Sequence, residues 1–384
     1  MEREAEGAAV AGVRCVSCGN RFSSAKVLGT CPYCGSILSC EYDYERAKET
    51  LTRESLRGRR KTLWRYREVR RDVAPQNIVT LGEGMTPVVR LESGPLKDDG
   101  IIPTGTFKAR GMAVAVSKAE DLGLAKLAVQ SAGNAGAALA CYAALGGLAA
   151  RVFMPTETPQ SILECAWYGA EVILVDGNIG DAGARMRTKM DGYFDMSTLK
   201  EPYRLEGKKT MGYEIAEQTG FELPEAIVYP TGGGTGLLGM WKAFDELENL
   251  GLIGSERPTM FSVQSEACAP IVDAFSPGKE TPDADFPDGV TAAVGLRVPR
   301  PFAGRQMLSV LRESKGGAVS VSDPEILAGM RALAGEGVLA CPEGAASLAA
   351  HRKLLREGNI AKDEKVLLYN TGTGQVPRPR PASP

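Results

Sequence analysis

Pro103-Thr104-Gly105-Thr106-Phe107-Lys108-Ala109-Arg110-Gly111 is the most informative stretch of this chain. It predicts one lysine in a tight turn directly before an apolar segment of helical character, Met112 to Val116. A lysine in such a turn can hold its amine at the mouth of a pocket, and lysine is the side chain that forms Schiff bases with carbonyl cofactors. Taken alone, the motif also fits a surface lysine at the start of a helix.

Two further loops place glycines between a predicted strand and a predicted helix. Ser131-Ala132-Gly133-Asn134-Ala135-Gly136 precedes an alanine-rich helix, and Thr231-Gly232-Gly233-Gly234-Thr235-Gly236 precedes another. Glycines at such turns let backbone N–H groups converge on an anion, and the helix N-terminus adds positive potential. The second loop lacks the Gly-Lys-Ser/Thr ending of a P-loop, which argues against a nucleotide triphosphate. Either loop alone could be a tight turn, but the ordered combination with Lys108 is more specific.

These motifs resemble those of the fold-type II pyridoxal-phosphate enzymes, the tryptophan synthase β-like group. Within that group the chain is most similar to the threonine synthases, on the segments Leu81–Pro87, Glu206–Glu214 and Asn370–Gly374. The resemblance extends from about Cys15 to about Gly374 and covers nearly the whole chain. It implies an α/β fold with two three-layer αβα domains, mostly parallel sheets and a cofactor in the cleft between them. The implied boundaries are an N-terminal tail and ribbon at 1–42, a large domain at 43–111 and 226–384, and a small inserted domain at 112–225.

The resemblance also implies roles around pyridoxal 5'-phosphate. Lys108 would anchor the cofactor and then act as the base, and Asn134 would lie beside the ring hydroxyl. Thr371 would approach the pyridine nitrogen, where a hydroxyl is a weaker partner than a carboxylate and leaves the ring largely unprotonated. A plain turn threonine is the alternative for Thr371. The cofactor phosphate would be held by Gly232, Gly233, Gly234, Thr235 and Gly236.

Substrate contacts follow from the same resemblance. The backbone at Ser131, Ala132, Gly133 and Asn134 would bind a substrate carboxylate. Arg204 matches a family position near a substrate phosphate, with a surface salt bridge as its alternative role. Many threonine synthases carry hydroxyl residues where this chain has Ala132 and Ala135, which leaves the substrate less certain than the cofactor.

The resemblance implies threonine synthase activity, which converts O-phospho-L-homoserine and water to L-threonine and phosphate. The alternative on the same scaffold is a threonine or serine ammonia-lyase, or a β-replacement enzyme, acting on a small amino acid. A non-catalytic interaction protein that kept the fold is a third hypothesis, which the intact lysine and glycine loop oppose.

Two CxxC pairs near the N-terminus predict a structural zinc site. Four thiolates can close a tetrahedral site, and each pair is followed by glycine. Two chance free-thiol or redox pairs are the alternative. Because the chain is not basic, we expect a structural or interface role instead of nucleic-acid binding. Cys40 lies outside the spacing, so the predicted ligands are Cys15, Cys18, Cys31 and Cys34.

Composition excludes several classes of function. The net charge is −2, with both signs spread along the chain, which gives no footprint for nucleic acid or an anionic membrane. No apolar run approaches the roughly 20 residues of a membrane helix, and the acidic start is not a signal peptide. The single histidine, His351, excludes a Ser-His-Asp triad and a multi-histidine metal site. We expect a soluble cytoplasmic enzyme, with a homodimer implied by the resemblance.

The segments between these motifs alternate in a way that predicts βαβ units and a mostly parallel sheet. Residues 43–75 are predicted to be helical, and 276–290 to be a long surface loop. Residues 1–12 and 375–384 are predicted to be loose termini. The predicted helices include Asn134–Leu145 and Gly236–Leu250. The predicted strands are Leu127–Val129, Arg151–Met154, Val172–Val175, Ile227–Tyr229, Phe261–Gln264, Ala318–Val321 and Val366–Tyr369.

Overall fold

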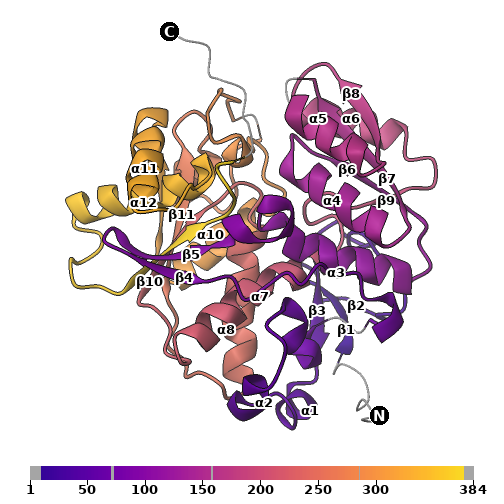
Figure 1. The fold of residues 1–384 in the computed structure, drawn as a ribbon, viewed down its shortest axis with the longest axis horizontal. Coiled ribbons are helices and arrows are strands. Elements are labelled where there is room, and N and C mark those ends of the chain that lie inside the picture. The colour runs from indigo at the N-terminus through magenta and orange to yellow at the C-terminus, as the bar shows by residue number, and fades with distance from the viewer. Residues whose placement is uncertain (1–9, 71–72, 157–158, 285, 376–384) are drawn as a thin grey trace.

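The computed structural model describes residues 10–70, 73–156, 159–284 and 286–375. Two α/β bodies lie beside each other, and a small three-stranded sheet lies below the body on the right of Figure 1. Within the described residues, no helix has the length and apolar character needed to cross a membrane. The helices are α1 (Tyr44–Lys48), α2 (Arg53–Arg57), α3 (Lys108–Asp121), α4 (Asn134–Leu145), α5 (Pro159–Trp167), α6 (Ile179–Thr188), α7 (Tyr203–Gln218), α8 (Thr235–Asn249), α9 (Pro270–Phe275), α10 (Gly304–Glu313), α11 (Asp323–Gly335) and α12 (Pro342–Glu357).

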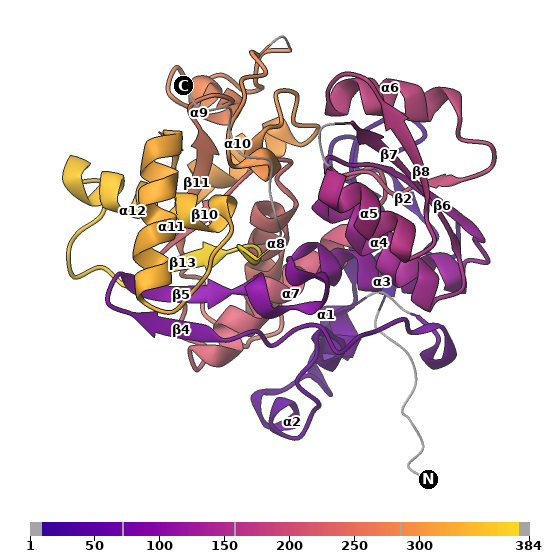
Figure 2. The ribbon, with the colours of Figure 1, turned by 45° about the horizontal axis from the view of Figure 1, so that its top comes forward.

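The larger body is built on a six-stranded sheet with the order β12-β11-β10-β13-β5-β4. All neighbouring strands are parallel except the edge pair β4 and β5. The two central strands, β10 and β13, are buried along their whole length, as expected for a parallel sheet covered on both faces. Figure 2 shows helices α11 and α12 on one side of this sheet and α7 and α8 on the other. The strands are β4 (Val88–Leu91), β5 (Gly94–Asp98), β10 (Ala226–Pro230), β11 (Thr259–Ser265), β12 (Gly317–Val321) and β13 (Val366–Asn370).

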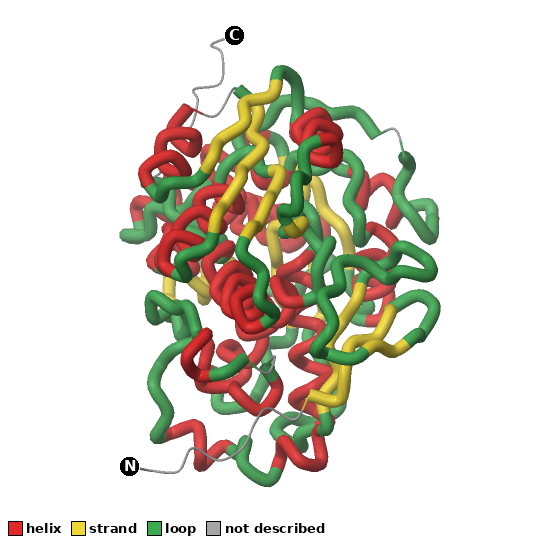
Figure 3. The backbone as a smooth tube through the Cα atoms, turned by 90° about the vertical axis from the view of Figure 1, so that its right-hand side faces the viewer, coloured by secondary structure: helices red, strands yellow, loops and turns green. Residues whose placement is uncertain are grey.

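The smaller body contains a parallel four-stranded sheet with the order β8-β7-β6-β9. Helices α4 and α5 contact it, and α6 packs against β6 and β7. Figure 3 shows the strands of this body running between helices on both faces. The strands are β6 (Lys126–Gln130), β7 (Ala149–Pro155), β8 (Glu171–Val175) and β9 (Phe194–Asp195).

Helices α3 and α7 cross where both carry glycine. A Cβ on Gly207 would overlap the carbonyl of Arg110, so only glycine allows this approach. Arg110 is fully buried and binds Asp99 at 2.7 Å and Glu214 at 2.5 Å. Removing one partner of such a buried pair costs about 3–5 kcal/mol, because a charge is left uncompensated. The helix that begins at Lys108 is therefore fixed to α7.

The N-terminal sheet has the order β2-β1-β3, and both pairs are antiparallel. We call residues 10–42 the ribbon. Its last strand docks on the larger body, because the hydroxyl of Tyr42 donates to Glu206 at 2.6 Å. The strands are β1 (Val10–Cys15), β2 (Arg21–Phe22) and β3 (Leu38–Tyr42).

Most predicted elements are present, and the differences have physical causes. Each of the seven predicted strands is a strand, and 276–290 carries no helix or strand in its described part. Residues 10–12 belong to β1, so that part of the N-terminal prediction was wrong, while residues 1–9 and 376–384 lie outside the described residues. The predicted helical stretch 43–75 is broken into α1, α2 and 3-10 turns. Lys108 is the first residue of α3 and does not precede it.

Candidate active site

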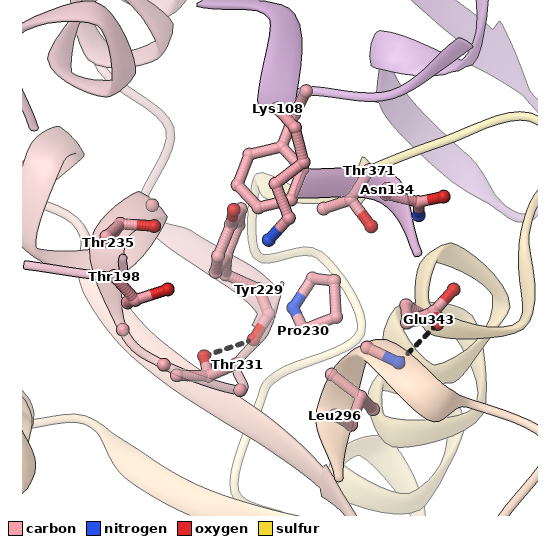
Figure 4. Close-up of a pocket in the computed structure, with 16 residues that line it drawn as sticks. Lys108, Asn134, Thr198, Tyr229, Pro230, Thr231, Thr235, Leu296, Glu343 and Thr371 are labelled. Atoms are coloured by element: carbon pink, nitrogen blue, oxygen red, sulfur yellow. Dashed lines mark hydrogen bonds between the residues drawn. The ribbon is translucent and has the colours of Figure 1, made fainter. Parts of the chain in front are cut away.

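One pocket lies at the carboxyl ends of strands in the larger body, the usual ligand position in open α/β sheets. Figure 4 shows its walls. The glycine loop after β10, the turn after β13 and the segment after β5 all reach it, because these three strands are neighbours in one sheet. The N-terminus of α4 contributes from the smaller body. The lining residues are Phe107, Lys108, Asn134, Thr198, Tyr229, Pro230, Thr231, Gly232, Gly233, Gly234, Thr235, Gly236, Gly295, Leu296, Glu343 and Thr371.

The structure brings together Lys108, Asn134, Thr371 and the glycine loop from Gly232 to Gly236. Of the other predicted residues, Ser131, Ala132, Gly133 and Arg204 do not line this pocket. The four cysteines form a separate cluster in the ribbon.

Lys108 projects its amine into the middle of the pocket, between Tyr229 and Thr371 (Figure 4). Its Nζ lies 4.2 Å from the centre of the Phe107 ring. Burial lowers the pKa of Lys108 to about 8, and the positive charge of Arg204 adds to this effect. At a pKa of about 8, about a tenth of this amine is uncharged at pH 7, far more than for an ordinary lysine, and the uncharged form is the one that attacks a carbonyl.

The backbone joins Lys108 to Thr371 across the pocket. The N–H of Phe107 donates to the carbonyl of Thr371 at 2.9 Å, and Thr106 forms a β-bridge with Gly372. The side chain of Thr371 is buried and lies 3.6 Å from the Sγ of Cys341. The lysine and the threonine thus keep a fixed separation.

The glycine loop has no room for side chains. Gly234 adopts a φ of +84°, and a Cβ there would overlap the side chain of Met307. A Cβ on Gly232 would overlap the carbonyl of Gly295, and one on Gly233 would lie 2.8 Å from the Cγ2 of Thr198. The loop precedes α8, a helix of 15 residues, and fits a phosphate at the helix N-terminus.

The asparagine loop is braced by its own serine. The Oγ of Ser131 accepts from the backbone N–H of Gly133 at 3.1 Å and of Gly136 at 2.9 Å. Gly133 has a φ of +149°, which favours glycine. The bracing places Asn134 as the first residue of α4, with its side chain at the pocket.

Arg204 is buried in the first turn of α7, so the alternative of a surface salt bridge was wrong. Its Nη1 donates to the carbonyl of Met196 at 2.6 Å. Its Nε has no hydrogen-bond partner among the described residues. Burial lowers the pKa of this guanidinium.

Sequence reasoning did not assign eight of the lining residues: Phe107, Thr198, Tyr229, Pro230, Thr231, Gly295, Leu296 and Glu343. Glu343 is buried in the first turn of α12 and accepts the N–H of Gly295 at 2.7 Å. An acidic residue in the first turn of a helix is ordinarily explained by its interaction with the helix dipole. The sequence therefore gives no separate sign that Glu343 also lines a pocket. Phe107 lies inside the lysine motif and Tyr229 lies two residues before the glycine loop motif, and this proximity in sequence was the available signal.

The ribbon cysteines meet as the spacing predicts. The sulfur atoms of Cys15, Cys18, Cys31 and Cys34 all lie within 4.8 Å of one another. Cys40 does not belong to this group. Four thiolates at such distances suit a tetrahedral ion, and this donor set favours zinc.

Comparison with known proteins agrees with this geometry. The family described as "Pyridoxal-phosphate dependent enzyme" matches residues 79–372. A threonine synthase of Methanocaldococcus jannaschii is 34% identical over 376 residues, which cover 94% of this chain and 92% of the relative. A threonine synthase of Methanosarcina acetivorans is 36% identical over 376 residues, which cover 94% and 91%.

Solved structures with the same fold include other activities. A threonine deaminase from T.th. has a TM-score of 0.61 and 26% identity, over 78% of this chain and 94% of that one. Maize serine racemase has a TM-score of 0.65 and 23% identity, over 76% and 89%, and this likeness concerns the fold alone.

Proposed function

Because the chain belongs to the threonine synthase family of pyridoxal-phosphate-dependent enzymes, we propose that it converts O-phospho-L-homoserine and water to L-threonine and phosphate. The observation that carries the proposal is the meeting of Lys108, Asn134, Thr371 and the glycine loop in one pocket. The full-length similarity to threonine synthases supports this substrate over others.

The pocket suits pyridoxal phosphate on three counts. Lys108 would bind its aldehyde, since burial keeps the amine partly uncharged. The backbone N–H groups of the loop Gly232–Gly236 would hold its phosphate, and the protein atoms packed against its glycines leave no room for side chains there. Thr371 would meet the ring nitrogen with an uncharged hydroxyl, and Asn134 would donate to the ring hydroxyl.

When bound, pyridoxal phosphate supplies an electron-withdrawing ring that acidifies the α-carbon of the amino acid. Lys108, once freed by the substrate amine, would accept the Cα proton and carry protons between Cα and Cβ. Gly295 and Leu296 line the pocket and would limit the access of water to it. In the proposed reaction, phosphate leaves Cγ and one water then adds at Cβ. The residues that line the pocket include one lysine, Lys108, so its amine would both bind the cofactor and transfer the protons.

The substrate would be held at two ends. Backbone N–H groups at Ser131, Ala132, Gly133 and Asn134 would bind its carboxylate at the start of α4. Arg204 would attract its phosphate, because a buried guanidinium interacts strongly with an anion. Neither role follows from the pocket lining, and both are proposals.

A direct assay tests the reaction. Cofactor-loaded protein given O-phospho-L-homoserine should release phosphate and threonine in equal amounts. Absence of both products would reject the proposal.

The threonine deaminase neighbour favours an ammonia-lyase as the second candidate. Alanine at positions 132 and 135, where hydroxyl residues are common in threonine synthases, points the same way. Faster formation of keto acid from L-threonine or L-serine than of threonine from the phosphorylated substrate would favour this candidate. Failure to turn over either amino acid would exclude it.

We also propose a structural zinc ion on Cys15, Cys18, Cys31 and Cys34, since these sulfur atoms converge. The cysteines are odd in number and four of them lie in one cluster, which favours a reducing compartment over a disulfide framework and supports the cytoplasm as the compartment. A homodimer that binds no nucleic acid, and the small-domain boundary at 112–225, remain our proposals on the family resemblance.

A further inference from the structure

We propose that the ribbon positions the cofactor pocket, through a buried cluster that contains Ile37 of the ribbon and Leu199 beside the pocket. The inference goes beyond the proposed reaction and rests on the proposed function in taking the glycine loop as a cofactor site and the cysteine cluster as a metal site.

The contact is a small cluster of buried side chains, separate from the main core. Its members Ile37 and Leu199 are 3% and 1% exposed. A second approach lies nearby, because a Cβ on Gly29 would lie 2.9 Å from the carbonyl of Lys200. The ribbon therefore abuts residues 199–200 at two points. The cluster comprises Ile37, Leu199, Leu205 and Ala303, with Leu238 packed against it.

The cysteine pairs hold Ile37 in place. The N–H of Val16, inside the first pair, donates to the carbonyl of Ile37 at 3.1 Å. The N–H of Cys31, in the second pair, donates to the carbonyl of Ser36 at 2.8 Å. A metal ion on the four sulfur atoms would fix these two pairs relative to each other, and Ile37 with them.

Leu199 has a backbone that needs such support. Its φ is +59°, in the left-handed region that is unfavourable for a leucine. Residues in this region persist where their surroundings over-determine them. The buried side chain packed in the Ile37 cluster supplies that constraint, so loss of the contact would let the backbone relax.

A change in the backbone at Leu199 would directly affect the pocket. Thr198 precedes Leu199 and lines the pocket (Figure 4). Its Cγ2 lies 2.8 Å from the place where a Cβ on Gly233 would stand, so it packs on the glycine loop. A change of φ at Leu199 would therefore move Thr198 away from the loop that holds the phosphate.

Cofactor titration of two matched variants tests the proposal. Ile37→Ala removes the contact, while Val13→Ala removes a side chain that is equally buried in the ribbon but belongs to the main core. Cofactor-free protein, still carrying its ribbon metal, is titrated with pyridoxal phosphate well below its melting temperature. We expect Kd to rise about five- to tenfold in Ile37→Ala, which corresponds to about 1–1.4 kcal/mol. Val13→Ala should stay within about twofold. Equal effects in the two variants, or no effect in Ile37→Ala, would overturn the proposal.

A second pair of variants tests the role of the backbone. Leu199→Ala and Leu199→Gly both remove the leucine side chain, but glycine adopts a positive φ freely. We expect weaker cofactor binding in Leu199→Ala than in Leu199→Gly, although the latter deletes more atoms. The reverse order would contradict the proposed mechanism.

Hydrogen exchange provides a readout that does not depend on the reaction or the cofactor. In cofactor-free Ile37→Ala, the amides at 197–200 and 232–236 should exchange faster than in wild type, and those of Val13→Ala should not. Unchanged exchange at both segments would contradict the proposed coupling between the ribbon and the glycine loop. Wild-type protein that makes no threonine would reject the proposed reaction and leave this result interpretable.

Discussion

Arg204 donates a 2.6 Å hydrogen bond from its Nη1 to the backbone carbonyl of Met196, and both side chains are buried. The bond ties the first turn of α7 to the segment that follows β9. The guanidinium also lowers the pKa of Lys108, although it does not line the pocket. Its influence on the pocket is therefore electrostatic as well as structural.

Arg204→Ala should discriminate between the candidate substrates. If Arg204 meets a substrate phosphate, the variant loses a charge-assisted contact of roughly 1.5–3 kcal/mol. That corresponds to a loss of about ten- to over a hundredfold in kcat/KM for O-phospho-L-homoserine. Turnover of an unphosphorylated amino acid should change much less, and the cofactor should stay bound. Equal loss for both substrate classes, or loss of the cofactor, would assign Arg204 a purely structural role.

Capture of the cofactor should depend on pH with a midpoint near the pKa of Lys108. The uncharged amine reacts, so the rate of capture should rise as pH increases through about 8. Arg204 lowers this pKa and Glu343 raises it. Arg204→Ala should therefore move the midpoint to higher pH, and Glu343→Gln should move it to lower pH. To measure both midpoints, cofactor-free protein is mixed with excess pyridoxal phosphate at a series of pH values, and the rate of the absorbance change is recorded. Shifts in the same direction would contradict the assignment.

Lys108→Ala should abolish turnover and leave the fold intact. The side chain projects into the pocket, so its removal disturbs little of the core. The glycine loop should still hold some cofactor without a covalent bond. Borohydride treatment followed by mass spectrometry should find the cofactor attached to wild type and not to the variant. Lys126→Ala, which removes an exposed lysine, is the control and should behave as wild type. Wild-type turnover in Lys108→Ala would overturn the proposed site.

Gly234→Ala should weaken cofactor binding strongly. Alanine at a φ of +84° costs roughly 1–2 kcal/mol, and its Cβ would overlap Met307. We expect Kd to rise at least about tenfold, since about 1.4 kcal/mol is a factor of ten. Gly335→Ala is the matched control, because a Cβ there meets open space at the end of α11. If both variants bind the cofactor equally well, the loop does not hold the phosphate.

Loss of the ribbon metal should lower stability. Cys18→Ser and Cys31→Ser remove one thiolate each from the cluster, whereas Cys40→Ser changes a buried cysteine outside it. Elemental analysis should find about one zinc per wild-type chain on the four-ligand expectation. Tm should fall in the first two variants by more than about 2–4 °C, the shift that about 1 kcal/mol produces in a domain of about 150–250 residues. Zinc-free protein with unchanged Tm and oligomeric state would contradict the proposal.

Local chemistry made much of the pocket predictable. The glycine loop and the asparagine loop have the glycines that are typical of a turn between a strand and a helix, and both lie at the start of a helix. The strands of the parallel sheets are short runs of apolar residues, such as β10 and β13, which their length and continuous apolar character identify.

Strand β5 could not be predicted from the sequence, because it depends on a side chain from a distant part of the chain. Strand β5 carries Pro95, Lys97 and Asp98, a composition that argues against a buried strand. Lys97 is nevertheless fully buried, because Glu214 binds its amine at 2.8 Å. That glutamate lies more than a hundred residues away in the chain, so no local pattern reveals the pairing.

Strand β13 lies in the interior of the six-stranded sheet, between β10 and β5, although it is the final strand of the described residues. The turn that follows it carries Thr371, and the carbonyl of Thr371 receives the N–H of Phe107. A chain cut short before Val366 would therefore lose both the strand that links β10 to β5 and the turn that supplies Thr371 to the pocket.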